Sequence, residues 1–214
     1  DPSEAEPVMS ALEKQSGQLV AILNTHHHWD HTGGNKALLE KWPELAVYGH
    51  VSDRGRIPGQ TEFPADGDTF WLGKEQGVVR HIPGHTTGAV AYCFEEDVFT
   101  GDTLFYGGCG RLFEGTPAMM FRSLTQRLAG ELDGTTRVWC GHEYTVQNLH
   151  FALHSEPDNQ AIRSKLNWAE NERRAGRATV PSTLNDELAV NPFVRAKTVA
   201  ELAELRSQKD NFRG

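Results

Sequence analysis

Cysteine is scarce and basic residues are outnumbered, and each shortage excludes a class of protein. Three cysteines in 214 residues, with no Cys-x-x-Cys pair, argue against a disulfide framework in a chain of this size. We predict that Cys93, Cys109 and Cys140 are reduced, buried side chains. Because 29 acidic residues outnumber 21 basic ones, the net charge of -8 gives no attraction for a phosphate backbone, and no nucleic-acid partner is expected.

Long hydrophobic runs are also missing. No window of about 18 apolar residues occurs, so no segment is expected to span a bilayer, and a soluble protein without a membrane partner is predicted. The chain begins at Asp1 rather than at Met, so a targeting segment, if the gene encodes one, would lie upstream. Either a cytoplasmic or a mitochondrial location therefore fits the sequence.

The pattern of apolar residues predicts a mixed α/β domain followed by helices. Short apolar segments that end in polar residues or glycine predict strands over residues 19–25, 45–49, 78–82, 89–94, 98–100 and 137–140. Helical periodicity predicts helices over residues 3–17 with Ser3 as N-cap, 35–41, from Pro117 onward, 162–176 and 199–205. The composition changes after Glu156-Pro157, so we predict a metal-binding catalytic domain over residues 1–155 and a helical substrate-binding domain over residues 156–214.

Histidines are concentrated in the stretch THHHWDHTGGN, residues 25–35, directly after the first predicted strand. Side chains alternate in an extended loop, so His26 and His28 can converge on one ion while His27 and Trp29 face elsewhere. Imidazole ligands without a thiolate suit zinc, iron or manganese and leave positions for water.

The same stretch offers ligands for a second ion. Asp30 and His31 follow a bend in the chain and can reach a different metal from the one beside His28. Gly33 and Gly34 are expected to let the backbone turn tightly before the next helix.

A single loop cannot complete two coordination spheres, and further candidates follow three later strands. Each is the first metal-capable residue past a predicted strand, and each is preceded by glycine, which permits a close approach of the backbone. These candidates are His85, Asp102 and His142. The repeated pattern predicts that four strand ends point to one place. The histidines without this context are expected on the surface or in the core: His50, His81, His150 and His154.

Together, these candidates resemble the ligand pattern of the metallo-β-lactamase superfamily. More narrowly, the segments TGDTLF (100–105), CGRLFEGT (109–116), CGHEYT (140–145), TVPSTL (179–184) and NPF (191–193) resemble glyoxalase II, the hydroxyacylglutathione hydrolases. The resemblance covers essentially the whole chain. It implies a four-layer αβ/βα sandwich with metals at one sheet edge, then a helical C-terminal domain. Family members also carry two or three strands before this chain's first turn, so the resemblance implies that those N-terminal strands are missing.

The resemblance implies two divalent metal ions as cofactors, with zinc favoured over iron or manganese. One ion would be held by His26, His28 and His85, the other by Asp30, His31 and His142, and Asp102 would bridge both. A hydroxide between the ions would attack the thioester, and Asp30 could also accept a proton. The implied reaction converts S-D-lactoylglutathione to D-lactate and glutathione, a step of methylglyoxal detoxification.

A glutathione site is implied as well. Arg206 and Lys209 lie three apart on one predicted helix face and match the family pattern that binds the glycyl carboxylate. Tyr144 matches a residue that hydrogen-bonds the peptide. Arg111 and Phe113 stand where animal members often have Lys and Tyr, so the charge is kept and one hydroxyl is lost. These two departures leave the range of thioesters open.

Two alternatives to this reaction remain. A persulfide dioxygenase or another hydrolase of the superfamily would share the metal loop, although persulfide dioxygenases lack a long tail such as residues 157–214. A non-catalytic protein that binds glutathione conjugates or a protein partner would be expected to have lost ligands, and all are present here. The resemblance favours a monomeric enzyme that acts on a small-molecule glutathione thioester.

Overall fold

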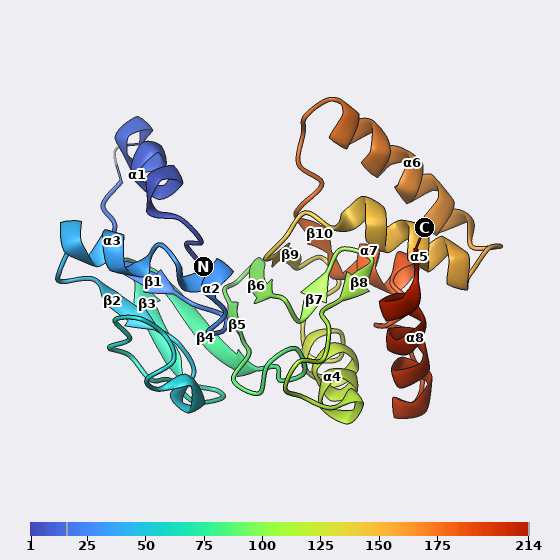
Figure 1. Cartoon of the computed structure of the whole chain (residues 1–214), viewed down its shortest axis with the longest axis horizontal. Helices are drawn as coiled ribbons and strands as arrows, with labels where there is room; N and C mark the ends of the chain where they lie inside the picture. Colours follow the sequence, from blue (N-terminus) through green and yellow to red (C-terminus); the bar gives the residue numbers. More distant parts are fainter. Residues whose placement is uncertain (16, 214) are drawn as a thin grey trace.

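The computed structural model describes residues 1–15 and 17–213, with the strands running through the middle of the molecule (Figure 1). Helices α1 (Ala5–Lys14) and α3 (Asn35–Lys41) lie on one side of the strands. Helices α4 (Pro117–Arg122), α5 (Thr145–Ser155), α6 (Gln160–Arg174), α7 (Leu184–Val190) and α8 (Val199–Asn211) lie toward the other. Within the described residues, no helix is long and apolar enough to cross a membrane.

The larger sheet has six strands in the spatial order β10-β9-β6-β5-β4-β3. Their bounds are β3 (Thr69–Leu72), β4 (Glu75–His81), β5 (Val90–Cys93), β6 (Asp97–Gly101), β9 (Arg137–Cys140) and β10 (Ser182–Thr183). Strand β5 is antiparallel to both β4 and β6, and β6 is parallel to β9. The carboxyl ends of β4, β6 and β9 therefore meet at the same edge of the sheet.

A smaller sheet pairs β1 (Ala21–Leu23) in parallel with β2 (Ala46–Tyr48). Its outer face packs on α1 and α3, where Ile22 and Val47 join Leu38 in one apolar cluster. Leu23 and Tyr48 on its inner face pack instead against the larger sheet. The period of two along a strand directs neighbouring side chains to opposite layers.

The larger sheet divides its side chains in the same way. Tyr92 of β5 faces the smaller sheet, whereas Ala91 and Cys93 face the cluster that contains Met120 of α4 and Leu202 of α8. The order of layers is helix, sheet, sheet, helix, which confirms the predicted four-layer αβ/βα sandwich.

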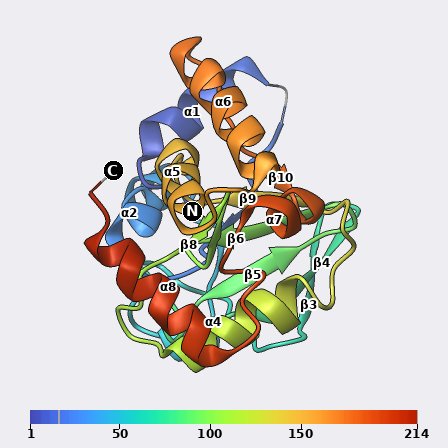
Figure 2. The same ribbon diagram turned by 90° about the vertical axis from the view of Figure 1, so that its right-hand side faces the viewer.

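The helical end of the molecule is shown in Figure 2, with α6 at the top and α8 at the lower left. Leu149 of α5 packs against Ile162 and Leu166 of α6 in a separate apolar cluster. The C-terminal helical region is thus confirmed, with α6 and α8 where the periodicity predicts them. The division of the chain near residue 155 stays a prediction.

The expected elements differ from the observed ones mainly at short segments. The expected elements do not include α5, α7 and β3, nor the strands β7 (Leu104–Phe105), β8 (Gly108–Cys109) and β10, each of which has two residues and cannot display a periodicity. Helix α5 does have Val146, Leu149 and Leu153 at helical spacing, and α7 begins at a capping box of Thr183 and Asp186, so both carry a signal that the prediction did not use. The expected N-cap of the first helix is wrong: Glu4, not Ser3, occupies that position, and no side chain caps the helix. This helix ends at Lys14, and Ser16, near its predicted end, lies outside the described residues.

The cysteines are all free thiols, as predicted, and Cys93 and Cys109 are buried, whereas Cys140 is only partly buried. Burial raises the pKa of Cys93 to about 11 and that of Cys140 to about 12, and it raises the pKa of Cys109 as well. These thiols are therefore protonated at neutral pH, which removes them as nucleophiles.

A buried carboxylate fixes the turn between β7 and β8. Glu187 is fully buried and accepts hydrogen bonds from Ser182 Oγ (2.5 Å), Gly107 N (3.0 Å) and Asn191 Nδ2 (2.8 Å). Asn191 also donates to Gly108 O at 3.0 Å. Burial raises the pKa of Glu187 to about 7 despite these three donors.

We predict that Glu187→Gln changes the pH dependence of stability. Because the folded pKa lies above the ordinary value of 4.5, the stabilising contribution is fully present below about pH 4.5 and is lost as the pH rises through 7. The glutamine oxygen can accept from Gly107 N and Asn191 Nδ2, and its amide can donate to Ser182 Oγ, but the side chain does not titrate. Urea unfolding between pH 5 and 8 should show the wild type losing up to about 3 kcal/mol relative to the variant. Parallel pH profiles for the two proteins would contradict this.

Candidate metal centre

The candidate ligands meet at the edge of the sheet where three parallel strands end. His85, Asp102 and His142 follow β4, β6 and β9, and the loop after β1 brings the early histidines to the same edge. Thr25 O in this loop accepts a hydrogen bond from Val90 N (2.9 Å) at the start of β5. The predicted convergence of four strand ends is therefore what the structure shows.

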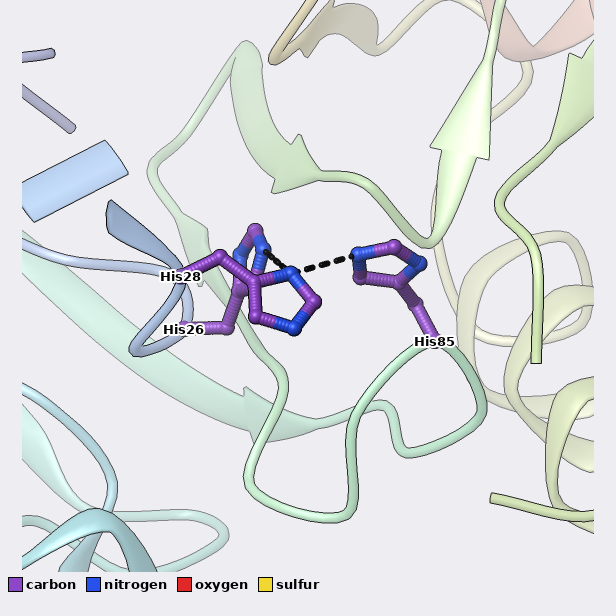
Figure 3. Close-up of side chains that lie close together, drawn as sticks. All are labelled: His26, His28 and His85. Atoms are coloured by element: carbon purple, nitrogen blue, oxygen red, sulfur yellow. Dashed lines mark hydrogen bonds between the residues drawn. The ribbon is translucent and has the colours of Figure 1, made fainter. Parts of the chain in front are cut away.

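Three histidine rings form the first group. The Nε2 atoms of His26 and His85 lie 3.1 and 3.0 Å from Nδ1 of His28, and Figure 3 shows the three rings turned toward one another. Zinc–nitrogen bonds of 2.0–2.1 Å in a tetrahedron would place ligand nitrogens about 3.3 Å apart. The ring nitrogens are thus already at the spacing of metal ligands, which identifies this group as one that could hold an ion.

The second group combines a carboxylate with two imidazoles. Helix α2 (Trp29–Thr32) carries Asp30 and His31, and His142 reaches them from the end of β9. The Nε2 atom of His142 lies 3.3 Å from both Asp30 Oδ2 and His31 Nε2. These three residues could hold a second ion.

Asp102 lies between the two groups. Its Oδ1 is 3.2 Å from Nε2 of His31, and its Oδ2 is 3.6 Å from Nε2 of His85 and 3.5 Å from Nε2 of His142. The carboxylate is buried, and Oδ1 has no hydrogen-bond partner within the described residues. A buried carboxylate oxygen without a hydrogen-bond partner is unfavourable. A cation bound on each side of Asp102 would compensate for this.

The protonation of the site favours metal binding. Burial lowers the pKa of His26 to about 2 and also lowers the pKa of His28 and His85, so these rings are neutral, which is the form that binds metal. Burial alone would raise the pKa of Asp102, but contacts with His142 and His31 hold it well below its usual range. The contact with Asp102 in turn raises the pKa of His142, so a metal ion must displace a proton at this ring.

The outer nitrogens of the imidazole rings are held by protein groups. Nδ1 of His31 lies 3.0 Å from Asp1 Oδ2, and Nδ1 of His26 lies 3.1 Å from Thr25 Oγ1. Asp1 also accepts hydrogen bonds from the backbone and hydroxyl of Thr25, each at 2.6 Å. Such partners orient ligand histidines and raise their basicity. The role of Asp1 is invisible in the sequence, because 30 residues separate it from His31.

The glycines around the site lie so close to neighbouring groups that a side chain would not fit. A Cβ on Gly141 would lie 2.5 Å from Asp102 Oδ1, and one on Gly101, which has φ of 50°, would lie 2.1 Å from Thr25 Oγ1. The chain turns at Gly33-Gly34 between α2 and α3, as predicted, although their φ angles of -60° and -80° are open to any residue. Their backbone packs directly on residues 2–4, where a side chain would collide.

His27 faces away from the metal groups, as predicted, and enters a network that the sequence does not reveal. Its Nδ1 lies 3.3 Å from Oδ1 of Asp53, which is fully buried and whose Oδ2 has no hydrogen-bond partner in the described residues. Arg56 bonds to His27, Asp53 and Glu114. Glu114 also accepts hydrogen bonds from Thr87 N (2.9 Å) and Oγ1 (3.0 Å). The network thus ties the histidine loop to the segments after His85 and Phe113.

We predict that Asp53→Asn weakens metal binding without unfolding the protein. Loss of the charge loosens His27, and with it the loop between the two neighbouring ligands. Changes of this kind cost about 10- to 100-fold in metal affinity. Chelator competition should show this weakening, while the exposed control Asp158→Asn keeps the wild-type affinity. An Asp53→Asn protein with unchanged metal affinity would show that the network has no such role.

A cavity of about 720 Å³ opens over the two groups. It is lined at one end by His28, Asp30 and Asp102. Every predicted substrate-binding residue also lines it: Arg111, Phe113, Tyr144, Arg206 and Lys209. The fold therefore brings α8, near the end of the sequence, to a metal site whose first candidate ligands lie near its start.

The cations in this cavity differ in availability. Arg206 is buried, and its guanidinium donates to Cys109 O (2.7 Å) and Asp210 Oδ1 (2.9 Å). Lys209 is half-buried with Nζ 3.3 Å from Gln147 O, and burial lowers its pKa to about 8. The side chain of Arg111 is 63% exposed. Lys209, Arg111 and the exposed Arg213 are thus cations of the cavity that can meet a substrate carboxylate, while Arg206 mainly holds the backbone before Arg111.

Comparison with known proteins first defines the class. Residues 1–142 match the metallo-beta-lactamase superfamily, and residues 143–212 match the hydroxyacylglutathione hydrolase C-terminus. ETHE1 from Myxococcus xanthus is 25% identical with a TM-score of 0.73, covering 98% of this chain and 79% of that one. TTHA1623, solved in a di-iron-bound form, is 28% identical with a TM-score of 0.63, covering 90% and 87%. The fold and site are those of a metallo-β-lactamase superfamily protein with a binuclear metal centre.

Curated relatives define the family within that class. The hydroxyacylglutathione hydrolase of Gloeobacter violaceus is 54% identical over 226 residues, and that of Gloeothece citriformis is 48% identical over 231. Each alignment covers 99% of this chain and 89% of the relative. The chain belongs to the hydroxyacylglutathione hydrolase family, also called glyoxalase II.

Proposed function

We propose that this chain hydrolyses S-D-lactoylglutathione to D-lactate and glutathione. Membership of the family makes it a metal-dependent hydrolase of glutathione thioesters. The observation that carries the proposal is the position of Asp102. This buried carboxylate lies between two groups of ligands at one end of a cavity, and Lys209 and Arg111 line the same cavity. A thioester of an acidic tripeptide fits this pairing of charges.

The proposed ligands are those that converge at the sheet edge. One ion would be held by His26, His28 and His85, and the other by Asp30, His31 and His142, with Asp102 shared. Zinc is proposed, with iron or manganese as alternatives, because imidazole and carboxylate ligands suit all three. When bound, two such ions supply a water of lowered pKa and a Lewis acid for the oxyanion of the thioester.

The protein's own residues would bind and orient the substrate. Asp30 is 3.3 Å from His142 at the edge of the cavity, where its carboxylate could accept a proton from the attacking water. Tyr144 stacks on the ring of His142 with centroids 4.9 Å apart and lines the cavity, where its hydroxyl would hydrogen-bond the peptide of the substrate. Lys209 and Arg111 would bind the carboxylates of glutathione.

The comparisons favour this function over the two alternatives. A persulfide dioxygenase would not be expected to have the C-terminal region that matches over residues 143–212. A non-catalytic scaffold would not be expected to keep both complete groups of candidate ligands. The relatives come from cyanobacteria and give no support to a mitochondrial location. A monomeric state without a nucleic-acid partner stays a prediction.

We predict that His28→Ala removes both metal and activity. His28 Nδ1 is the atom that the other two rings of its group approach, so its loss opens that coordination sphere. Metal analysis should find fewer than two ions per chain, and turnover of S-D-lactoylglutathione should fall by at least about a thousandfold. The half-exposed control His150→Ala should keep both. Turnover by metal-depleted His28→Ala protein would refute the metal-dependent reaction.

We predict that substrate capture depends on the charge of Lys209. Since its pKa is lowered to about 8, kcat/KM for S-D-lactoylglutathione should be highest below pH 8 and decrease as the pH rises and the ammonium group loses its proton. Lys209→Ala should raise KM about tenfold with little change in kcat. Lys209→Arg should remove the alkaline decrease, and the exposed control Lys197→Ala should behave as the wild type. If Lys209→Arg kept the decrease of kcat/KM at alkaline pH, a group other than Lys209 would be responsible for that decrease.

A further inference from the structure

We propose that Trp29 and Phe113 form an acyl-binding wall that extends the substrate class to glutathione thioesters whose acyl group is aromatic or large and apolar. The inference rests on the proposed function and names the substrate class of the same site. It concerns the part of the substrate on the far side of the thioester from glutathione.

Exposed aromatic side chains gather around the metal cavity. Trp29 is 81% exposed, Phe113 64% and Tyr144 44%, and all three line the cavity that also contains His28 and Asp102. Single exposed apolar residues are normal on a protein surface, but a group of aromatics around one cavity marks a binding site. Tyr144 packs on His142 and Phe105, which leaves Trp29 and Phe113 as the less covered rings.

The position of Trp29 is fixed by the metal loop. It lies between the candidate ligands His28 and Asp30 at the start of α2, where His31 N donates to His28 O at 3.0 Å. The indole also lines a second cavity of about 230 Å³ with Asp30 and His142. Trp29 thus lies beside both groups of ligands while presenting most of its surface to solvent.

Phe113 covers the first group of histidines. Its ring centroid lies 5.6 Å from that of His28 and 5.2 Å from that of His85, both in edge-to-face geometry. Its backbone N donates to His85 O at 3.1 Å, so the residue is fixed to the metal edge. An apolar ring is therefore held next to the place where the thioester must react.

Charge decides which end of the cavity takes each part of the substrate. The carboxylates of glutathione are attracted to Lys209 and Arg111, while the thioester carbon must reach the ligands around Asp102. The acyl substituent would then lie beside His28, where Trp29 and Phe113 are exposed aromatic residues of the cavity lining. A lactoyl group covers little of two such rings, whereas an aromatic acyl group can pack against them in offset or edge-to-face geometry.

The binding test uses thioethers that cannot be hydrolysed. S-benzylglutathione places an aromatic group where S-methylglutathione has a methyl group. The ratio of their two dissociation constants, measured by calorimetry, therefore reports how much the aromatic group gains from Trp29 and Phe113. We expect the wild type to bind the benzyl compound about tenfold more tightly, which corresponds to about 1.4 kcal/mol. Trp29→Ala should reduce this ratio to about twofold, and Trp29→Phe should restore much of it. The control Trp71→Ala, a 61% exposed residue of β3 outside the cavity, should keep the wild-type ratio.

The kinetic test compares S-phenylacetylglutathione with S-D-lactoylglutathione in the same variants, with metal content measured in each. We expect Trp29→Ala to lower the ratio of the two kcat/KM values about tenfold, and Trp71→Ala to leave it unchanged. The proposed acyl-binding wall would be wrong if the wild type and Trp29→Ala had equal ratios of the two kcat/KM values. It would also be wrong if the wild type bound both thioethers equally. A wild type that hydrolyses neither thioester would refute the proposed function instead, and the thioether ratios would still decide the role of Trp29.

Discussion

The metal centre depends on placing one buried carboxylate among imidazole rings. Asp102 has little exposure to water, and its Oδ1 lacks a hydrogen-bond partner within the described part of the chain. Burial alone would neutralise such a group, yet the neighbouring His142 and His31 keep it charged. Two cations on either side of the carboxylate would complete the site. Glycine at positions 101 and 141 follows from this constraint, because a Cβ there would collide with Thr25 and with Asp102.

A second constraint links the metal edge to the C-terminal helices. Glu187 and Asn191 fix the short β7–β8 turn, whose first strand follows Asp102 and whose second leads to Arg111. Arg206 of α8 then holds the carbonyl of Cys109. The helical region therefore does more than add cations to the cavity. It also fixes the backbone that carries the substrate-facing residues, so folding of the C-terminal region and completion of the active site are coupled.

The fold was predictable where elements are long enough to show a period. The strand over residues 137–140 and the helix over 35–41 have the predicted bounds, and Thr116 with Pro117 starts α4 as their sequence indicates. Two-residue strands escape prediction because they contain less than one clear repeat. Helices α5 and α7 do carry a periodicity and a capping box, which the prediction did not use. Gly33 and Gly34 form the predicted turn, but the sequence does not show which backbone lies against them.

The sequence by itself determined the types and the spacing of the candidate ligands, because His26, His28, Asp30 and His31 are close along the chain and the later ones repeat a strand–glycine–ligand pattern. Only the tertiary structure decided which groups support them. The partners of His31 and His27, the burial of Arg206, and the exposure of Trp29 all arise from contacts between distant segments. Such contacts leave no periodicity or spacing in the sequence, since each depends on how two packed surfaces meet.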